Sequence, residues 1–302
     1  MGAYEAPQWL LPAFVRSVQA VGGTAQPEEI RSTGEALVER WSSPERRFHN
    51  LKHLLSVLGR VDELTEETHE PDLVRLAAWY HGAVFEAGMA ATHANRGGED
   101  ETASADVAQR ELVALGVPEA RARRVHDLVV RLARHTPDPA DPDSAVLCDA
   151  DLGMLAVEPQ RYKAYLEDLH DEYAHIPKAE FLRARQRILR KLLARTSLFV
   201  SPLSERWEEP ARQNVTAELA RVDKELARIE AEQAGDASAV PPTVPGSTAS
   251  AVRPTVPGPA SSAVTPTVLG PAPSAGPTMH RLDASTRPAA AVIPKSAIRT
   301  RF

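Results

Sequence analysis

The chain has 302 residues, 43% of them hydrophobic and 25% charged, and a formal net charge of −6. It contains no run near the roughly 20 apolar residues that cross a bilayer and opens with no basic stretch ahead of an apolar one, so we expect neither membrane insertion nor secretion. The single cysteine, Cys148, excludes an intrachain disulfide and is typical of a reducing compartment, which predicts a cytoplasmic protein. The acidic balance argues against nucleic acid as the main ligand.

Helical spacing of apolar residues runs through the first three quarters of the chain. Strand alternation is hard to find there, and the clearest interruptions are Gly116 with Pro118, the proline-rich stretch 137–142, and Pro177. The segments whose apolar residues stand three and four apart are 73–85, 105–116, 122–135, 162–175 and 181–195. The sequence therefore predicts an all-α body over residues 1–234.

A last helix is expected at about 208–233, ahead of a tail of different composition. Its apolar seam, with alternating spacings of four and three, consists of Val215, Leu219, Val222, Leu226 and Ile229. Such a seam packs either on its own domain or on a second copy in a homodimer. Residues 239–274 repeat every 12 residues and are rich in Pro, Ala, Ser and Thr, which predicts a disordered low-complexity tail over 235–302. A scaffold that tethers a partner through this tail is an alternative role.

The stretch that says most about a functional site is RRFHNLKHLLSVL (46–58), which contains two histidines. His49 and His53 stand four residues apart, so they share one face of a helix that is otherwise mostly apolar. A neutral imidazole buried on that face needs a partner, whereas two histidines at this spacing are also typical of a hydrogen-bonded helix surface. Spacing alone leaves both a metal site and a surface pair open.

His81 and Asp151 lie on the apolar stripes of two further predicted helices. Asp151 is four residues from two leucines in LCDADLGML, whereas Asp149 falls outside that stripe, so Asp151 is expected to be the buried acid. A buried carboxylate with no Lys or Arg on its stripe becomes protonated, pairs or binds a metal. One backbone carbonyl would satisfy His81 alone, but inward polar side chains on three apolar helices favour a common divalent metal site.

The chain resembles the HD-domain metal-dependent phosphohydrolases over about residues 8–219. The landmarks that carry the resemblance are FHNLKH, AAWYHGAVF, EDETASADVA, RHT, LCDADLG, EYAHIPKAEFLRARQRILRKLLAR and EEPARQN, in this order. The resemblance implies an all-helical HD bundle in which His53, His81 and Asp151 hold the metal. It also implies hydrolysis of a phosphate ester of a small molecule, with a nucleotide as the family-level expectation. Similarity to cyclic-nucleotide phosphodiesterases implies that His49 protonates the leaving oxygen.

The chain departs from the family at the pair that names it, because His81 is followed by Gly82 instead of aspartate. Glycine has no side-chain ligand, so one ion of the Mn, Fe, Zn, Mg or Co class is expected instead of two. Replacement by another acid, among them Glu101, Asp149 or Glu86, and a site without catalysis both stay open. The competing functions are an inactive HD-fold protein that binds a ligand or partner, and an iron-dependent oxygenase.

Six residues are expected around the metal or the substrate. They are Asn50, Gly82, Glu101, His135, Asp149 and Arg185. Ordinary explanations stay open for several of them: a helix cap at Asn50, a helix-start acid at Glu101, and a satisfied core histidine at His135. The planar guanidinium of Arg185 suits a phosphate, although the surrounding RARQRILRK is also typical of a solvated helix face.

Overall fold

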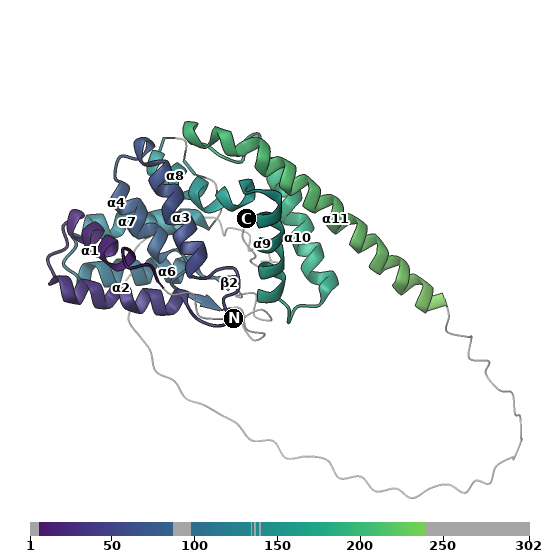
Figure 1. Ribbon diagram of the computed structural model, residues 1–302, viewed down its shortest axis with the longest axis horizontal. Helices are drawn as coiled ribbons and strands as arrows, with labels where there is room; N and C mark the ends of the chain where they lie inside the picture. The colour runs from purple at the N-terminus through teal and green to yellow at the C-terminus, as the bar shows by residue number, and fades with distance from the viewer. Residues whose placement is uncertain (1–5, 87–97, 134, 136, 139, 239–302) are drawn as a thin grey trace, which may run out of the picture. The chain divides into compact units, whose positions relative to one another are not determined.

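The computed structural model describes residues 6–86, 98–133, 135, 137, 138 and 140–238 (Figure 1). The predicted tail from residue 239 onward lies outside these ranges. The helices are α1 (Leu10–Ala20), α2 (Pro27–Trp41), α3 (Leu51–Glu63), α4 (Pro71–Tyr80), α6 (Glu101–Ala114), α7 (Glu119–Leu132), α8 (Pro142–Leu152), α9 (Pro159–Glu172), α10 (Lys178–Leu193) and α11 (Glu205–Ser238), with short 3₁₀ turns at Thr65–Glu67, Gly153–Ala156 and Pro202–Ser204. The predicted helical body is confirmed, and none of the helices in the described ranges has the length and apolar character that crossing a membrane requires.

The described chain also contains a pair of very short strands, which the sequence pattern did not predict. β1 (Phe85–Glu86) and β2 (Gly98–Glu99) pair antiparallel, with Phe85 opposite Glu99. Two residues a strand are too few to show alternation, which needs about four. The pair matters because it fixes the backbone of Glu99 beside the end of α4.

Local sequence signals set the starts of several helices. Side-chain oxygens of Asn50, Asp100 and Asp141 accept hydrogen bonds from backbone N–H groups in the first turns of α3, α6 and α8. These bonds satisfy donors that have no partner within the helix. The prolines in first turns are Pro27, Pro71, Pro142 and Pro159. Their fixed φ suits this position, where no N–H is needed.

The first hydrophobic core gathers side chains from α1–α4 and α6–α8, with α4 at its centre. Seven of the ten residues of α4 are buried, and α4 packs against α1, α3, α6, α7 and α8. The rings of Phe14 and Trp79 meet with centroids 4.9 Å apart. Since α4 is enclosed in this way, the residue that directly follows it, His81, also lies in the interior.

A second core lies among α9, α10 and α11. The seam predicted for the last helix is largely buried there: Val215, Val222 and Leu226 are at most 6% exposed. Packing on its own chain is thus confirmed for these residues, and a homodimer through α11 stays a prediction. The helix runs from Glu205 to Ser238, longer at both ends than the expected 208–233, and Pro210 lies near its start.

One buried carboxylate ties a loop to α8. The carboxylate of Asp149 on α8 accepts hydrogen bonds from the backbone N–H groups of Val200 and Ser201 and from the hydroxyls of Ser201 and Ser204. The expectation that Asp151, and not Asp149, is the buried acid of α8 is wrong, because Asp149 is only 1% exposed whereas the side chain of Asp151 is 12% exposed. The spacing of apolar residues within α8 does not reveal the burial of Asp149, because the residues that cover this face of α8, Val200 to Ser204, lie 51 to 55 residues further along the chain.

Candidate metal centre

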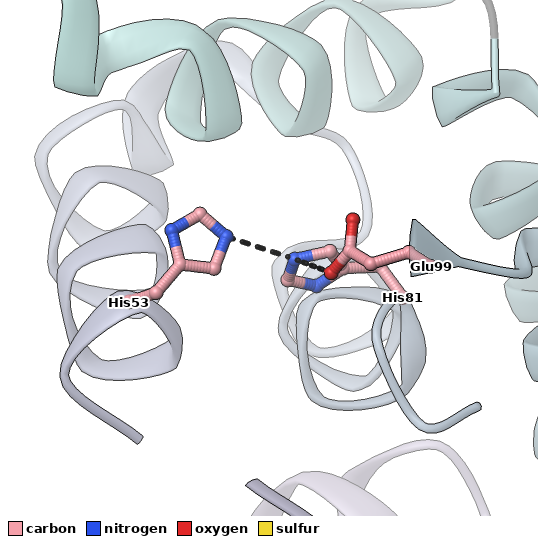
Figure 2. Close-up of side chains that lie close together, drawn as sticks. All are labelled: His53, His81 and Glu99. Atoms are coloured by element: carbon pink, nitrogen blue, oxygen red, sulfur yellow. Dashed lines mark hydrogen bonds and ion pairs between the residues drawn. The ribbon is translucent and has the colours of Figure 1, made fainter. Parts of the chain in front are cut away.

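Two histidine side chains from α3 and α4 meet inside the protein. His53 lies in the first turn of α3 and His81 follows the last residue of α4; the residues are 5% and 1% exposed. Their Nε2 atoms face each other at 3.2 Å (Figure 2). Two nitrogen lone pairs at this distance repel each other unless a proton or a cation lies between them. Either an N–H···N hydrogen bond between the two neutral rings or a bound cation satisfies this pair.

Hydrogen bonding of the far ring nitrogen orients His81 for metal binding. Its Nδ1–H donates to the carbonyl of Ala78 at 2.6 Å, which leaves Nε2 with a lone pair directed at His53. Burial lowers the pKa of His81, so its ring is neutral near pH 7. In His53 the Nδ1 atom is buried with no hydrogen-bond partner in the structure.

Asp151 approaches the same point from α8. Its Oδ1 atom lies 3.2 Å from Nε2 of His53 and 3.7 Å from Nε2 of His81. The other oxygen, Oδ2, lies 2.6 Å from Nε2 of His135. Burial acts to raise the pKa of Asp151, but hydrogen bonds from His135 and His53 outweigh it and hold the pKa well below its usual range. Asp151 is thus an ionised carboxylate fixed from two sides.

A fourth donor, Glu99 on β2, was missed by the sequence. Its Oε1 atom lies 3.8 Å from Nε2 of His81, and ligand atoms of His53, His81 and Glu99 all lie within 4.8 Å of one another. Glu99 points toward His81 in Figure 2. No periodic signal marks a two-residue strand, and the nearest sequence clue was the acidic run EDE, of which Glu101 was selected.

Four distances among the donor atoms lie near the spacing of a coordination sphere. Metal–ligand bonds of about 2.0–2.2 Å place neighbouring ligand atoms about 3–3.5 Å apart. The distances of 3.2 Å from His53 to His81 and to Asp151 match this spacing, and those of 3.7 and 3.8 Å from His81 to the two carboxylates exceed it by a few tenths. Two imidazoles with two carboxylates form a mixed nitrogen and oxygen set, which suits Mn²⁺, Fe²⁺, Co²⁺ or Zn²⁺.

His49 lies beside this cluster and forms a pair with Glu172 at the end of α9. Its Nδ1 atom is 2.5 Å from Oε1 of Glu172, while Oε2 accepts the backbone N–H groups of Arg47, Phe48 and His49 at 2.9–3.0 Å. Burial acts to lower the pKa of His49, but the Glu172 carboxylate outweighs it and the pKa is raised. The His49 and His53 rings are 5.7 Å apart between centroids. A protonated imidazole is thus held within reach of the cluster.

Arg46 connects the two parts of the site. Its guanidinium donates to the carbonyl of His49 at 3.1 Å and to that of Gly82 at 2.7 Å. It lies over the rings of Trp41 and Phe85, 5.0 and 4.5 Å from their centroids. Burial lowers the pKa of Arg46, and the nearby Glu99 and Glu172 oppose that shift. The positive charge offsets part of the negative charge that the carboxylates bring to this region.

The remaining predicted residues have contacts of their own. The Asn50 side chain caps α3 through the N–H of Lys52. Glu101 is the first residue of α6 and is 1% exposed. The guanidinium of Arg185 is buried in the second core, where it bonds both oxygens of Glu218 at 2.6 and 3.0 Å. That ion pair accounts for Arg185 without a phosphate. His135 is the one of the group that reaches the donor atoms, through Asp151.

The chain was compared with protein-family models, with curated proteins and with solved structures, and none of the three comparisons found a match. The site is therefore supported by its own geometry and by the sequence landmarks. Membership of the HD-domain family stays a prediction.

Proposed function

We propose that this protein binds one divalent metal ion through His53, His81 and a carboxylate of Asp151 and hydrolyses a phosphate ester of a small molecule. The convergence of donor atoms from α3, from the residue that follows α4, and from α8 is the observation that carries the proposal. The fit to a cation is supported by the Nε2 atoms of the two histidines, which face each other at 3.2 Å. A bound ion would lower the pKa of a coordinated water until it becomes a hydroxide nucleophile at neutral pH.

The orientation of the ligands is set by groups around them. The Ala78 carbonyl fixes the His81 tautomer, and His135 fixes the Asp151 carboxylate. Such outer contacts hold ligands in place before an ion arrives, which raises metal affinity. Because Asp151 is already ionised, it would not have to lose a proton when a metal binds.

His49 is the proposed general acid. Its Nδ1 is engaged by Glu172, so Nε2 carries the proton that is available for transfer. The attacking water gives up one proton to solvent and forms a new P–O bond, the bond to the leaving oxygen breaks, and that oxygen takes the Nε2 proton of His49, which His49 then regains from solvent. The products are a phosphate and an alcohol. Glu172 stabilises the charged imidazolium before transfer, as a general acid that must be protonated near neutral pH requires.

The phosphate ester as substrate class rests on the resemblance to HD-domain phosphohydrolases and on the neighbouring acid and metal site. Hydrolysis of such an ester needs an activated water on one side of phosphorus and a proton donor for the leaving oxygen on the other.

Elemental analysis of the full chain, purified without added metal or affinity-tag nickel, tests the metal site. About one ion per chain in the parent and far less in His53→Ala and Asp151→Ala, each folded by circular dichroism, would support it and justify a screen of phosphate esters. A folded parent that takes up no divalent ion would overturn the proposal. Full metal occupancy with no turnover across the screen would leave an inactive, ligand-binding protein.

A further inference from the structure

Gly82, directly after the ligand His81, lies in a space that leaves no room for a side chain. An ideal Cβ atom at this position would be 2.6 Å from Oε1 of Glu99 and 2.4 Å from Cη2 of Trp41. Non-bonded carbon and oxygen atoms do not approach this closely. The carboxylate of Glu99 thus occupies part of the volume that a side chain at residue 82 would fill. This is a steric reason for glycine at residue 82, directly after the C-cap residue of α4.

The backbone on both sides of Glu99 is held in place. Glu99 pairs with Phe85 in the short ladder, and the N–H of Asp100 donates to the carbonyl of Val84 at 3.0 Å. The N–H of Val84 in turn donates to the hydroxyl of Ser104 at 2.9 Å, and Asp100 caps α6. A carboxylate on such a fixed backbone loses little conformational entropy on binding an ion. The residue is 7% exposed, so water does not screen its charge from the histidines.

We propose that Glu99 is the fourth ligand of the metal centre and supplies from β2 the carboxylate that Gly82 cannot supply. This inference rests on the proposed metal centre and deepens it. Two imidazole nitrogens and two carboxylate oxygens neutralise a divalent cation, and this set predicts one ion per chain of the Mn²⁺, Fe²⁺, Co²⁺ or Zn²⁺ class. Glu99, and not Glu101, Asp149 or Glu86, is then the acid that replaces the missing side chain.

Cobalt binding to the full chain tests this assignment without reference to activity. The Co²⁺ absorption spectrum reports the ligand set, and competition with a chelator gives the affinity. Glu99→Gln keeps the shape of the side chain but loses its charge; Glu101→Gln, a matched change two residues away in an equally buried acid, is the control. We expect Glu99→Gln to bind Co²⁺ at least about 100-fold more weakly with an altered spectrum, since even changes outside the ligands cost 10–100-fold. Glu101→Gln should keep the parental spectrum and affinity.

The outcomes separate this inference from the proposed function. If the parent binds one Co²⁺ and Glu99→Gln binds it with the same affinity and spectrum, Glu99 is not a ligand although the centre exists. Loss of binding in Glu101→Gln with retention in Glu99→Gln would assign the fourth position to Glu101 and overturn the inference. A folded parent that binds no Co²⁺, Zn²⁺ or Mn²⁺ would remove the metal centre itself. Circular dichroism of each variant excludes misfolding as the cause of any loss.

Discussion

The Nε2 atom of His135 lies 2.6 Å from Oδ2 of Asp151, the oxygen that is not directed at His53 and His81. His135 adopts a φ of +42°, in the left-handed region that few residues other than glycine take. From this position its ring meets the Asp151 carboxylate, which indicates that His135 orients Asp151.

We predict that His135→Asn weakens metal binding by about 10–100-fold without abolishing it. Asparagine tolerates a positive φ, so the backbone is not at issue, but its side chain is too short to reach Asp151. Isothermal titration with Zn²⁺ or Mn²⁺ measures the effect. His69→Asn, a change in an exposed residue, serves as the control. Equal affinities of parent and His135→Asn would contradict the orienting role.

Introducing aspartate at residue 82 should destabilise the protein. A Cβ atom there would contact the rigid indole ring of Trp41 at 2.4 Å, so we expect Gly82→Asp to lower the free energy of unfolding by about 1–3 kcal/mol, as overpacking does. Metal affinity should fall as well, because Glu99 is displaced. Urea denaturation and metal titration give the two quantities.

Gly59→Ala is the matched control for that change. An added Cβ at Gly59 in α3 meets nothing within 4 Å, so the free energy of unfolding should rise by about 0.5–1 kcal/mol from helix propensity. Unchanged or greater stability of Gly82→Asp, with unaltered metal binding, would refute the packing argument at residue 82.

His49→Asn tests the general acid, once a hydrolysed ester is known. The asparagine amide nitrogen takes the place of Nδ1 and can still donate to Glu172, whereas the proton on Nε2 is lost. We expect kcat to fall by about 100- to 10,000-fold with metal content unchanged. A variant with parental kcat would show that another group protonates the leaving oxygen.

A pH dependence of stability is expected from Asp143, away from the metal site. Its carboxylate accepts bonds from Thr68, from the N–H groups of His69 and Glu70, and from Arg124. Burial acts to raise the pKa of Asp143, but the bonds from Thr68 and Arg124 outweigh it and the pKa is lowered. Because the folded pKa is the lower one, the stabilisation is complete above the unfolded pKa of about 3.9 and is lost as the pH falls through the folded value.

Asp143→Asn should therefore cost about 1–3 kcal/mol of unfolding free energy at neutral pH. It should also lose less stability than the parent between about pH 5 and about pH 3. Urea titrations across this range measure both effects. Asp106→Asn, in a side chain that is 65% exposed, should follow the parental curve. Parallel curves for Asp143→Asn and the parent would contradict the assigned pKa shift.

The sequence by itself determined the helical body, the seam of α11, and three inward polar residues, His53, His81 and Asp151. Each of these was readable because apolar residues three and four apart report a buried face within one helix. The structure brings the three side chains together. The Nε2 atoms of the two histidines and Oδ1 of Asp151 lie between 3.2 and 3.7 Å from one another.

Only the tertiary structure decided what surrounds them. Three contacts join residues that are between 16 and 123 positions apart in the chain. They are His81 with Glu99, His135 with Asp151, and His49 with Glu172. The burial of Asp149 likewise depends on a distant loop. Periodicity carries information over one or two turns of a helix, whereas these contacts depend on how helices and a short strand pair pack against one another, and that arrangement leaves no local pattern in the sequence.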